Sequence, residues 1–67
     1  MKEGLIGVEE LRDGSGVRAK VYEVGPNHFR AEYLDSSGAE VYLPSEHRGM
    51  TFEQAGQEIG DRLRGCR

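Results

Sequence analysis

The sequence predicts an α+β domain, in which a three- or four-stranded antiparallel β-meander carries one C-terminal α-helix on one face. Apolar and polar residues alternate with period two from Val17 to Pro44, and the turn-forming stretches "GPN" and "DSSG" interrupt the alternation. After Pro44 the apolar residues instead recur at spacings of three and four, as on one face of a helix. The two periods follow one another along the chain, which is typical of a sheet followed by a helix.

The alternating region predicts three strands, over residues 16–24, 28–34 and 39–43. The preceding segment, residues 4–12, fits either a strand or a short helix. We favour a strand, because Gly4 and Gly7 would each cost a helix about 1 kcal/mol relative to Ala. The following "DGSG" also predicts a hairpin turn. The meander would then have four strands.

Turn chemistry predicts the register of the last hairpin. A type I turn that begins at Asp35, with Gly38 in the left-handed conformation, suits "LDSSGAE". Counting outward from this turn gives the opposed pairs Asp35–Ala39, Leu34–Glu40, Tyr33–Val41, Glu32–Tyr42 and Ala31–Leu43. This register places both apolar sets on one face, whereas a slip of one residue would separate them.

The loop "GPN" predicts the register of the preceding hairpin in the same way. With residues 25–27 as the loop and Asn27 at positive φ, the opposed pairs are Val24–His28, Tyr22–Arg30, Val21–Ala31, Lys20–Glu32 and Ala19–Tyr33. A loop that is one residue longer is the alternative, because Pro26 does not suit a simple type I turn.

A helix is predicted over residues 52–64. Thr51 followed three residues later by Gln54 is a capping box, and acids precede arginines along the segment, as the helix dipole favours. Gly56 and Gly60 border the apolar stripe, so we expect them to let the helix approach the sheet closely. The expected core combines large apolar residues of the sheet and the helix: Phe29, Tyr33, Val41, Leu43, Phe52, Ile59 and Leu63.

Length and charge limit the functional classes. The chain has 67 residues, so we expect one domain over residues 1–67, with stability that a partner or a second copy would increase. A homodimer through an unpaired edge, at residues 17–24 or 39–43, is one alternative. The net charge of -3 disfavours long-range attraction to nucleic acids.

Cysteine usage and hydropathy point to a cytoplasmic protein. The single cysteine, Cys66, excludes an internal disulfide and a metal site built on paired cysteines. The first residues contain no apolar run long enough for a signal sequence or a membrane span. A reducing compartment fits both observations.

Catalysis is not expected. His28 begins a strand beside a turn and His47 lies in "SEHRG", so we interpret both as solvated polar residues rather than general bases. No spacing of His, Cys, Asp or Glu matches a zinc or calcium site, and no glycine pattern matches a phosphate-binding loop. We expect no cofactor.

The predicted register brings Tyr22, Arg30 and Tyr42 together on the sheet face that the helix leaves open. Tyr and Arg are enriched at the centres of protein interfaces, although tyrosine also simply suits strands. A second candidate patch is the acidic helix face with Glu53 and Glu58. We predict from these patches that the protein binds another protein.

A wider acidic surface supports the same prediction. Its members are Glu3, Glu9, Glu10, Glu46, Glu53, Glu58 and Asp61. Such a surface would dock on a basic, nucleic-acid-binding protein by imitating phosphate charge, although acidic surfaces also serve solubility alone. The sequence therefore predicts a small acidic regulatory or inhibitory protein.

Nucleic-acid binding through the open face is the alternative function. The predicted sheet and helix over residues 17–64 resemble in topology the arm-binding domains of tyrosine recombinases and the plant AP2 domains, and this resemblance implies contact with a nucleic acid. The predicted register weighs against it, because Lys20 faces Glu32 and Tyr22 faces Arg30. Such cross-strand pairs explain these residues by sheet stability alone.

Two further resemblances imply an inhibitor. The segment from Val41 to Leu63, with "TFEQA" at its helix start, resembles the end of HicB-like antitoxins. In type, the chain is similar to the small acidic proteins of phages and other mobile elements, including many anti-CRISPR proteins. These proteins often act by blocking another protein.

Overall fold

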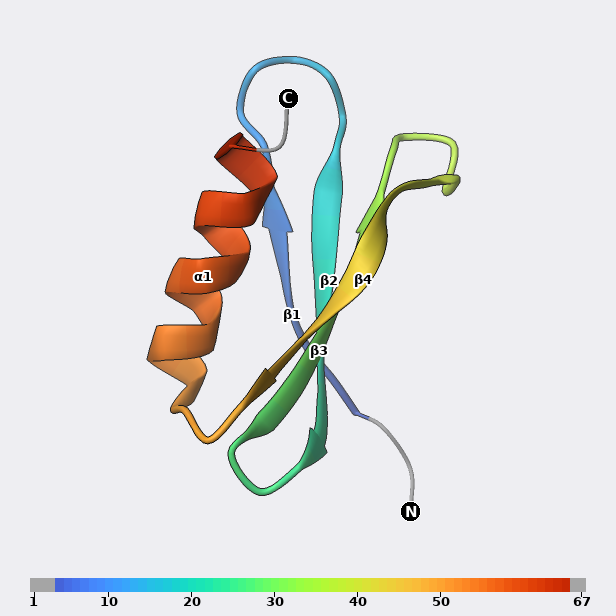
Figure 1. Cartoon of the computed structure of the whole chain (residues 1–67). Helices are drawn as coiled ribbons and strands as arrows, with labels where there is room; N and C mark the ends of the chain where they lie inside the picture. Colours follow the sequence, from blue (N-terminus) through green and yellow to red (C-terminus); the bar gives the residue numbers. More distant parts are fainter. Residues whose placement is uncertain (1–3, 66–67) are drawn as a thin grey trace.

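The computed structural model describes residues 4–65 of the chain, which form a four-stranded antiparallel sheet and one helix (Figure 1). The elements in chain order are β1 (Gly4–Glu10), β2 (Arg18–Gly25), β3 (His28–Leu34), β4 (Glu40–Arg48) and α1 (Phe52–Gly65). The strands follow one another in the sheet in the same order, so the predicted α+β meander with a C-terminal helix is confirmed. Glu3 and Cys66, both named above, lie outside the described residues.

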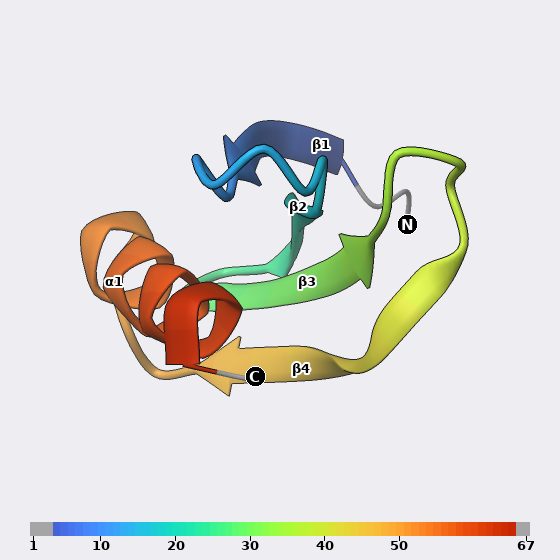
Figure 2. The same ribbon diagram turned by 90° about the horizontal axis from the view of Figure 1, so that it is seen from above.

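The helix covers one face of a curved sheet (Figure 2). Its contacts run mainly to β2 and β3, the two central strands. No other described element covers the opposite face, which is called the open face below (Figure 2). Alternate residues of each strand therefore face either the helix or the solvent.

The uncertain first segment is a strand. β1 pairs with β2, with Leu5 opposite Tyr22 and Gly7 opposite Val21, so Ile6 is the extra residue of a β-bulge. The turn that follows is closed by the Leu11 N–H, which donates to the Val17 carbonyl at 2.8 Å. The edges of the sheet are therefore β1 and β4, and the expectation that residues 17–24 form an edge is wrong.

The predicted register between β2 and β3 is confirmed over most of its length. Tyr22 faces Arg30, Lys20 faces Glu32, and only the pair next to the loop differs. There Gly25, rather than Val24, lies opposite His28, so the loop is shorter than predicted, not longer. Asn27 adopts a φ of 50°, and this left-handed residue completes the tighter turn.

The predicted turn between β3 and β4 is confirmed. Gly38 has a φ of 90° and donates its N–H to the Asp35 carbonyl at 3.0 Å. The Asp35 N–H in turn donates to the Ala39 carbonyl at 2.9 Å. The first strand pair after the turn, Leu34 with Glu40, is also as predicted.

Beyond that pair, the predicted register of β4 is wrong. Two irregularities each add a residue to β4, so Tyr33 faces Tyr42 and Ala31 faces Ser45. The strand also continues through residues 44–48, which the sequence pattern predicted to be a polar connection. The pairs predicted opposite Ala31, Glu32 and Tyr33 are therefore replaced.

The two bulges turn different residues of β4 toward the core. Tyr42 packs its ring edge-on against Tyr33, with ring centroids 5.9 Å apart. Val41 and Leu43, predicted to be core residues, are 37% and 77% exposed. Tyr42 is partly buried against the core. The bulged register also brings Ser45 within hydrogen-bond distance of Tyr33 and of His47.

The core lies between α1 and the centre of the sheet. Phe29, Tyr33, Ile59 and Leu63 are buried as predicted, together with Ala19, Val21, Ala31 and Ala55. Phe52, also predicted to be buried, is 48% exposed and packs at the margin against Phe29, with ring centroids 5.9 Å apart.

Small side chains and Gly60, but not Gly56, bring the helix close to the sheet: Gly60 is buried, and a Cβ added there would lie 2.9 Å from Glu9 Oε1 of β1. Ala19, Ala31 and Ala55 are fully buried, so the interface contains little side-chain volume there. A Cβ added at Gly56 would meet nothing within 4 Å, so the predicted role of Gly56 in close packing is wrong.

The predicted capping box begins the helix. The Gln54 N–H donates to Thr51 Oγ1 at 3.2 Å, and the Thr51 N–H donates to Gln54 Oε1 at 3.0 Å. These reciprocal bonds satisfy two backbone donors that would otherwise lack a partner at the helix start.

Candidate protein-binding surface

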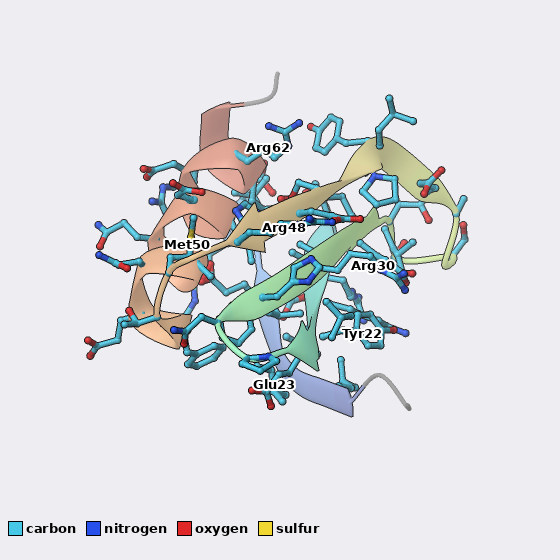
Figure 3. All side chains as sticks on the ribbon, turned by 60° about the horizontal axis from the view of Figure 1, so that its bottom comes forward. Tyr22, Glu23, Arg30, Arg48, Met50 and Arg62 are labelled. Carbon is cyan, nitrogen blue, oxygen red and sulfur yellow. The ribbon has the colours of Figure 1, made fainter. Side chains whose placement is uncertain are left out.

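Two of the three residues predicted for the open face lie together there. Tyr22 on β2 faces Arg30 on β3, and the guanidinium carbon of Arg30 lies 5.6 Å from the centroid of the Tyr22 ring (Figure 3). This distance is within the range of a cation–π interaction. The third residue, Tyr42, packs against Tyr33 on the helix side, so the expectation that it shares the open face is wrong.

β1 adds apolar side chains to this face that the sequence analysis missed. Leu5 lies opposite Tyr22 and Val8 lies opposite Lys20, so both are on the open face. Their side chains are 53% and 55% exposed. Periodicity did not identify them, because the bulge at Ile6 breaks the alternation on which a strand assignment depends.

These residues form a continuous patch across three strands. We call it the open-face patch and define it as Leu5, Val8, Lys20, Tyr22 and Arg30. It combines two exposed aliphatic side chains, an aromatic ring and two cations. This mixture of apolar and basic groups can bind a partner both by burying apolar surface and by charge–charge contacts.

The remaining charges of the open face are largely neutralised within it. Arg30 lies 3.3 Å from the Glu32 carboxylate, and Arg48 lies 3.2 Å from that of Glu46. A hydrogen bond from His28 lowers the pKa of Glu46, and the hydrogen bond from Arg48 lowers it further. Basic and acidic side chains therefore alternate over the face, with no extended positive field.

The two acids predicted to form a helix patch have different surroundings. Glu53 is exposed in the first turn of α1 and forms no ion pair with any residue in the range 4–65. Glu58 instead contacts β4, where its Oε1 lies 2.8 Å from His47 Nδ1. An ion pair between Glu58 and Arg62, which their spacing predicts, is absent from the described contacts. Glu53 and Glu58 therefore do not form one acidic surface.

His47 is the centre of a polar network that the sequence analysis missed. Its side chain is buried, with the residue 6% exposed, so the interpretation of His47 as a solvated residue is wrong. His47 Nε2 lies 2.8 Å from Ser45 Oγ, which lies 2.8 Å from the Tyr33 hydroxyl. Glu58 Oε1, a carboxylate oxygen, accepts from Nδ1–H; with a neutral ring, Nε2 then accepts from the Ser45 hydroxyl, and Ser45 Oγ accepts from Tyr33.

The order serine, histidine, carboxylate also occurs in hydrolases, but the setting here differs. A catalytic serine is held exposed at a sharp turn beside oxyanion donors. Ser45 lies within β4, partly buried and facing the helix side, with the Tyr33 hydroxyl against its Oγ. We interpret the network as structural, because it connects β3, β4 and α1 and satisfies a buried imidazole.

Other features of the described chain offer no ligand chemistry. Within residues 4–65, no helix is long and apolar enough to cross a membrane, and no three His, Cys, Asp or Glu residues cluster as metal ligands would. A hollow of about 950 Å³ lies between β1, the loop after it and the end of α1. Its rim carries acids and arginines in equal number, Glu9, Glu10, Arg12 and Arg64, so it favours neither charge of ligand.

Comparison of the chain with protein-family models, with curated proteins and with solved structures gives no match.

Proposed function

We propose that this chain is a small acidic regulatory or inhibitory protein that acts by binding another protein through the open-face patch. The observation that carries the proposal is the Tyr22–Arg30 pair beside the exposed side chain of Leu5, on the face without a helix. Tyrosine and arginine next to aliphatic groups are the composition of interface hot spots.

The charge pattern supports a protein partner rather than a nucleic acid. Three arginines of the open face lie near glutamates: Arg18 near Glu10, Arg30 near Glu32, and Arg48 near Glu46. A nucleic acid would have to compete with these carboxylates, and the net charge of -3 opposes its approach. A protein partner instead gains from burial of the apolar groups of the open-face patch, and the net charge does not oppose the approach of a basic protein.

The proposal extends to the type of protein and its location. Blocking of a partner, as inhibitors of the anti-CRISPR or antitoxin type do, requires a small domain with a rigid binding face and no catalytic site. The acidic composition supports a basic, nucleic-acid-binding partner, toward which long-range attraction would speed association. A cytoplasmic location and the absence of a cofactor are parts of the same proposal.

The test is quantitative capture of partners from lysates of the source cells. We expect Tyr22→Ala and Arg30→Ala each to weaken capture of the same protein by about tenfold or more, as loss of a hot-spot residue does. Leu43→Ala and Arg62→Ala are matched controls, because they remove an exposed leucine and an exposed arginine elsewhere. Equal capture by the wild type and both patch variants would exclude this surface.

Two further measurements separate the alternatives. Titration with duplex DNA and single-stranded RNA at low salt should show no binding, and tight binding there would replace the proposal with the nucleic-acid alternative. Glu53→Lys tests the helix acids, since Glu53 has no described ion pair. Glu58→Lys is unsuitable, because it would also remove the contact with His47.

A further inference from the structure

Both edge strands carry exposed aliphatic residues, and three of the five in the described sheet lie on β1, the others being Val41 and Leu43 on β4. β1 contains Leu5, Ile6 and Val8, which are 53%, 41% and 55% exposed. Its residues 4–8 read Gly-Leu-Ile-Gly-Val, with no charge in five positions. An uncharged apolar edge strand readily pairs with another strand. The backbone N–H and C=O groups on its outer side can form a further ladder of hydrogen bonds, and its side chains carry no charge that would prevent it.

The other edge strand is protected against such pairing. β4 contains two bulges and Pro44, and its last residues, Glu46 to Arg48, are charged or polar. Bulges, proline and charge are the usual devices that prevent an edge from accepting a further strand. Figure 2 shows β1 at the opposite margin of the sheet, with no described element beyond it.

The side chains of β1 match those of a second β1 strand in one antiparallel register. Leu5 and Val8 share the open face, because the bulge at Ile6 reverses the usual alternation between them. Opposed residues of an antiparallel pair lie on the same face. When Leu5 lies opposite Val8 of a second copy, both residues are on the open face, as this rule requires. Two-fold symmetry repeats the pair, because Val8 then lies opposite Leu5 of the second copy.

We propose that the protein forms a homodimer in which two β1 strands pair antiparallel, with Leu5 of each copy opposite Val8 of the other. A shift of one residue would place Leu5 opposite Gly7 or Glu9, which face the helix side. The dimer joins two four-stranded sheets into one continuous sheet and brings both aliphatic pairs into cross-strand contact on the open face, beside the two Tyr22 rings.

The charges of β1 are compatible with this register. The acidic residues Glu9 and Glu10 lie at the end of the strand, after the apolar run. Glu9 of each copy lies level with Gly4 of the other, so the two Glu9 residues are four ladder positions, or about 14 Å, apart along the strands once the bulge at Ile6 is allowed for. This separation exceeds the screening length of about 8 Å at physiological salt, so repulsion between them is weak.

Sedimentation over a range of concentrations tests the dimer. We expect the mass to rise from 7.5 kDa toward twice that value with concentration. Val8→Lys should weaken association by about tenfold or more, because each dimer loses two cross-strand contacts between Val8 and Leu5. Leu43→Lys is the matched control on the other edge strand and should leave the dimer unchanged.

A disulfide test reports the register and does not depend on a destabilising substitution. In a Cys66→Ser background, an equal mixture of Leu5→Cys chains and Val8→Cys chains should give a cross-linked dimer. Opposed Cα atoms lie about 4.5–5.5 Å apart, within disulfide range. The two cysteines are placed on separate chains because the bulge at Ile6 sets Leu5 and Val8 of one chain opposite Tyr22 and Lys20, only about 7 Å apart along β2. Leu5→Cys chains alone should stay uncross-linked, since the two copies of residue 5 are not opposed in this register.

Each outcome decides the proposal. A mass of one chain at every concentration overturns it, as does a dimer that Val8→Lys leaves intact or that Leu43→Lys disrupts. Circular dichroism confirms that each variant is folded. Arg30→Ala lies away from β1 and should keep the dimer while weakening partner capture, so failure of this inference and failure of the proposed function are distinguishable.

Discussion

His47 Nδ1 on β4 lies 2.8 Å from Glu58 Oε1 on α1, and this contact joins the edge strand of the sheet to the helix. Ser45 and Tyr33 continue the network into β3. The residues that hold the layers together on this side are therefore polar, although the core between the layers is apolar. A polar network of this kind is stabilising only while every member keeps its partner.

His47→Ala should lower the free energy of unfolding by about 1–3 kcal/mol, because it leaves the partly buried Ser45 hydroxyl without its imidazole partner and removes the contact to α1. Urea unfolding measures the change. His28→Ala is the matched control, since this histidine contacts Glu46 at 3.2 Å on the open face. The His28→Ala substitution should lower the free energy of unfolding by less than about 1 kcal/mol, because exposed ion pairs contribute no more than that. Equal losses in the two variants would contradict a structural role for His47.

Tyr42→Ser and Leu43→Ser test the bulged register of β4. Tyr42 packs against Tyr33, so its loss should cost about 1–3 kcal/mol. Leu43 is 77% exposed, and its substitution should change stability by no more than about 0.5 kcal/mol. Chemical denaturation compares the two variants. The simple hairpin register predicts the reverse order, with Leu43 as the costly position.

Gly56→Ala should stabilise the protein by up to about 1 kcal/mol, the difference in helix propensity between the two residues. A Cβ there meets nothing within 4 Å. Gly60→Ala should gain less, because its Cβ would lie 2.9 Å from Glu9 Oε1 and 3.2 Å from Arg64 Nη1. Thermal unfolding of the two variants ranks them. A larger gain at Gly60 would show that these two side chains move aside without cost.

Acid should weaken the fold partly through Glu46. Hydrogen bonds from His28 and Arg48 lower its pKa, so its contribution is fully present above its ordinary pKa and is lost as the pH falls through the lowered value. Glu46→Gln should therefore differ from the wild type most at neutral pH and least once the pH has fallen below the lowered pKa of Glu46. Urea midpoints across this range measure the difference. Glu40→Gln is the control on the same strand, and an equal pH dependence there would argue against a specific role for Glu46.

Much of the fold was predictable because short-range rules determine it. The turn at Asp35–Gly38, the capping box at Thr51 and the register of β2 on β3 each depend on residues within a few positions of one another. The Tyr22–Arg30 pair was predicted correctly for this reason, since it is the third pair from its turn.

The register of β4 could not be predicted in this way. Turn chemistry determines the pairs next to the turn, but the bulges are set by what fits the core, where Tyr42, Ser45 and His47 all turn inward. A pattern of strict alternation assigns Val41 and Leu43 to the core instead. The His47 network was missed for the same reason, because it requires the register that follows the bulges.

The position of β1 in the sheet makes it the strand with the least support within one chain. It pairs with β2 alone, its apolar side chains are largely exposed, and the helix packs mainly on β2 and β3. Such an element opens as a separate unit at a lower free energy than global unfolding. In the proposed dimer, closure of β1 and association become one linked equilibrium, so the amides of β1 would gain protection from hydrogen exchange as the protein concentration rises.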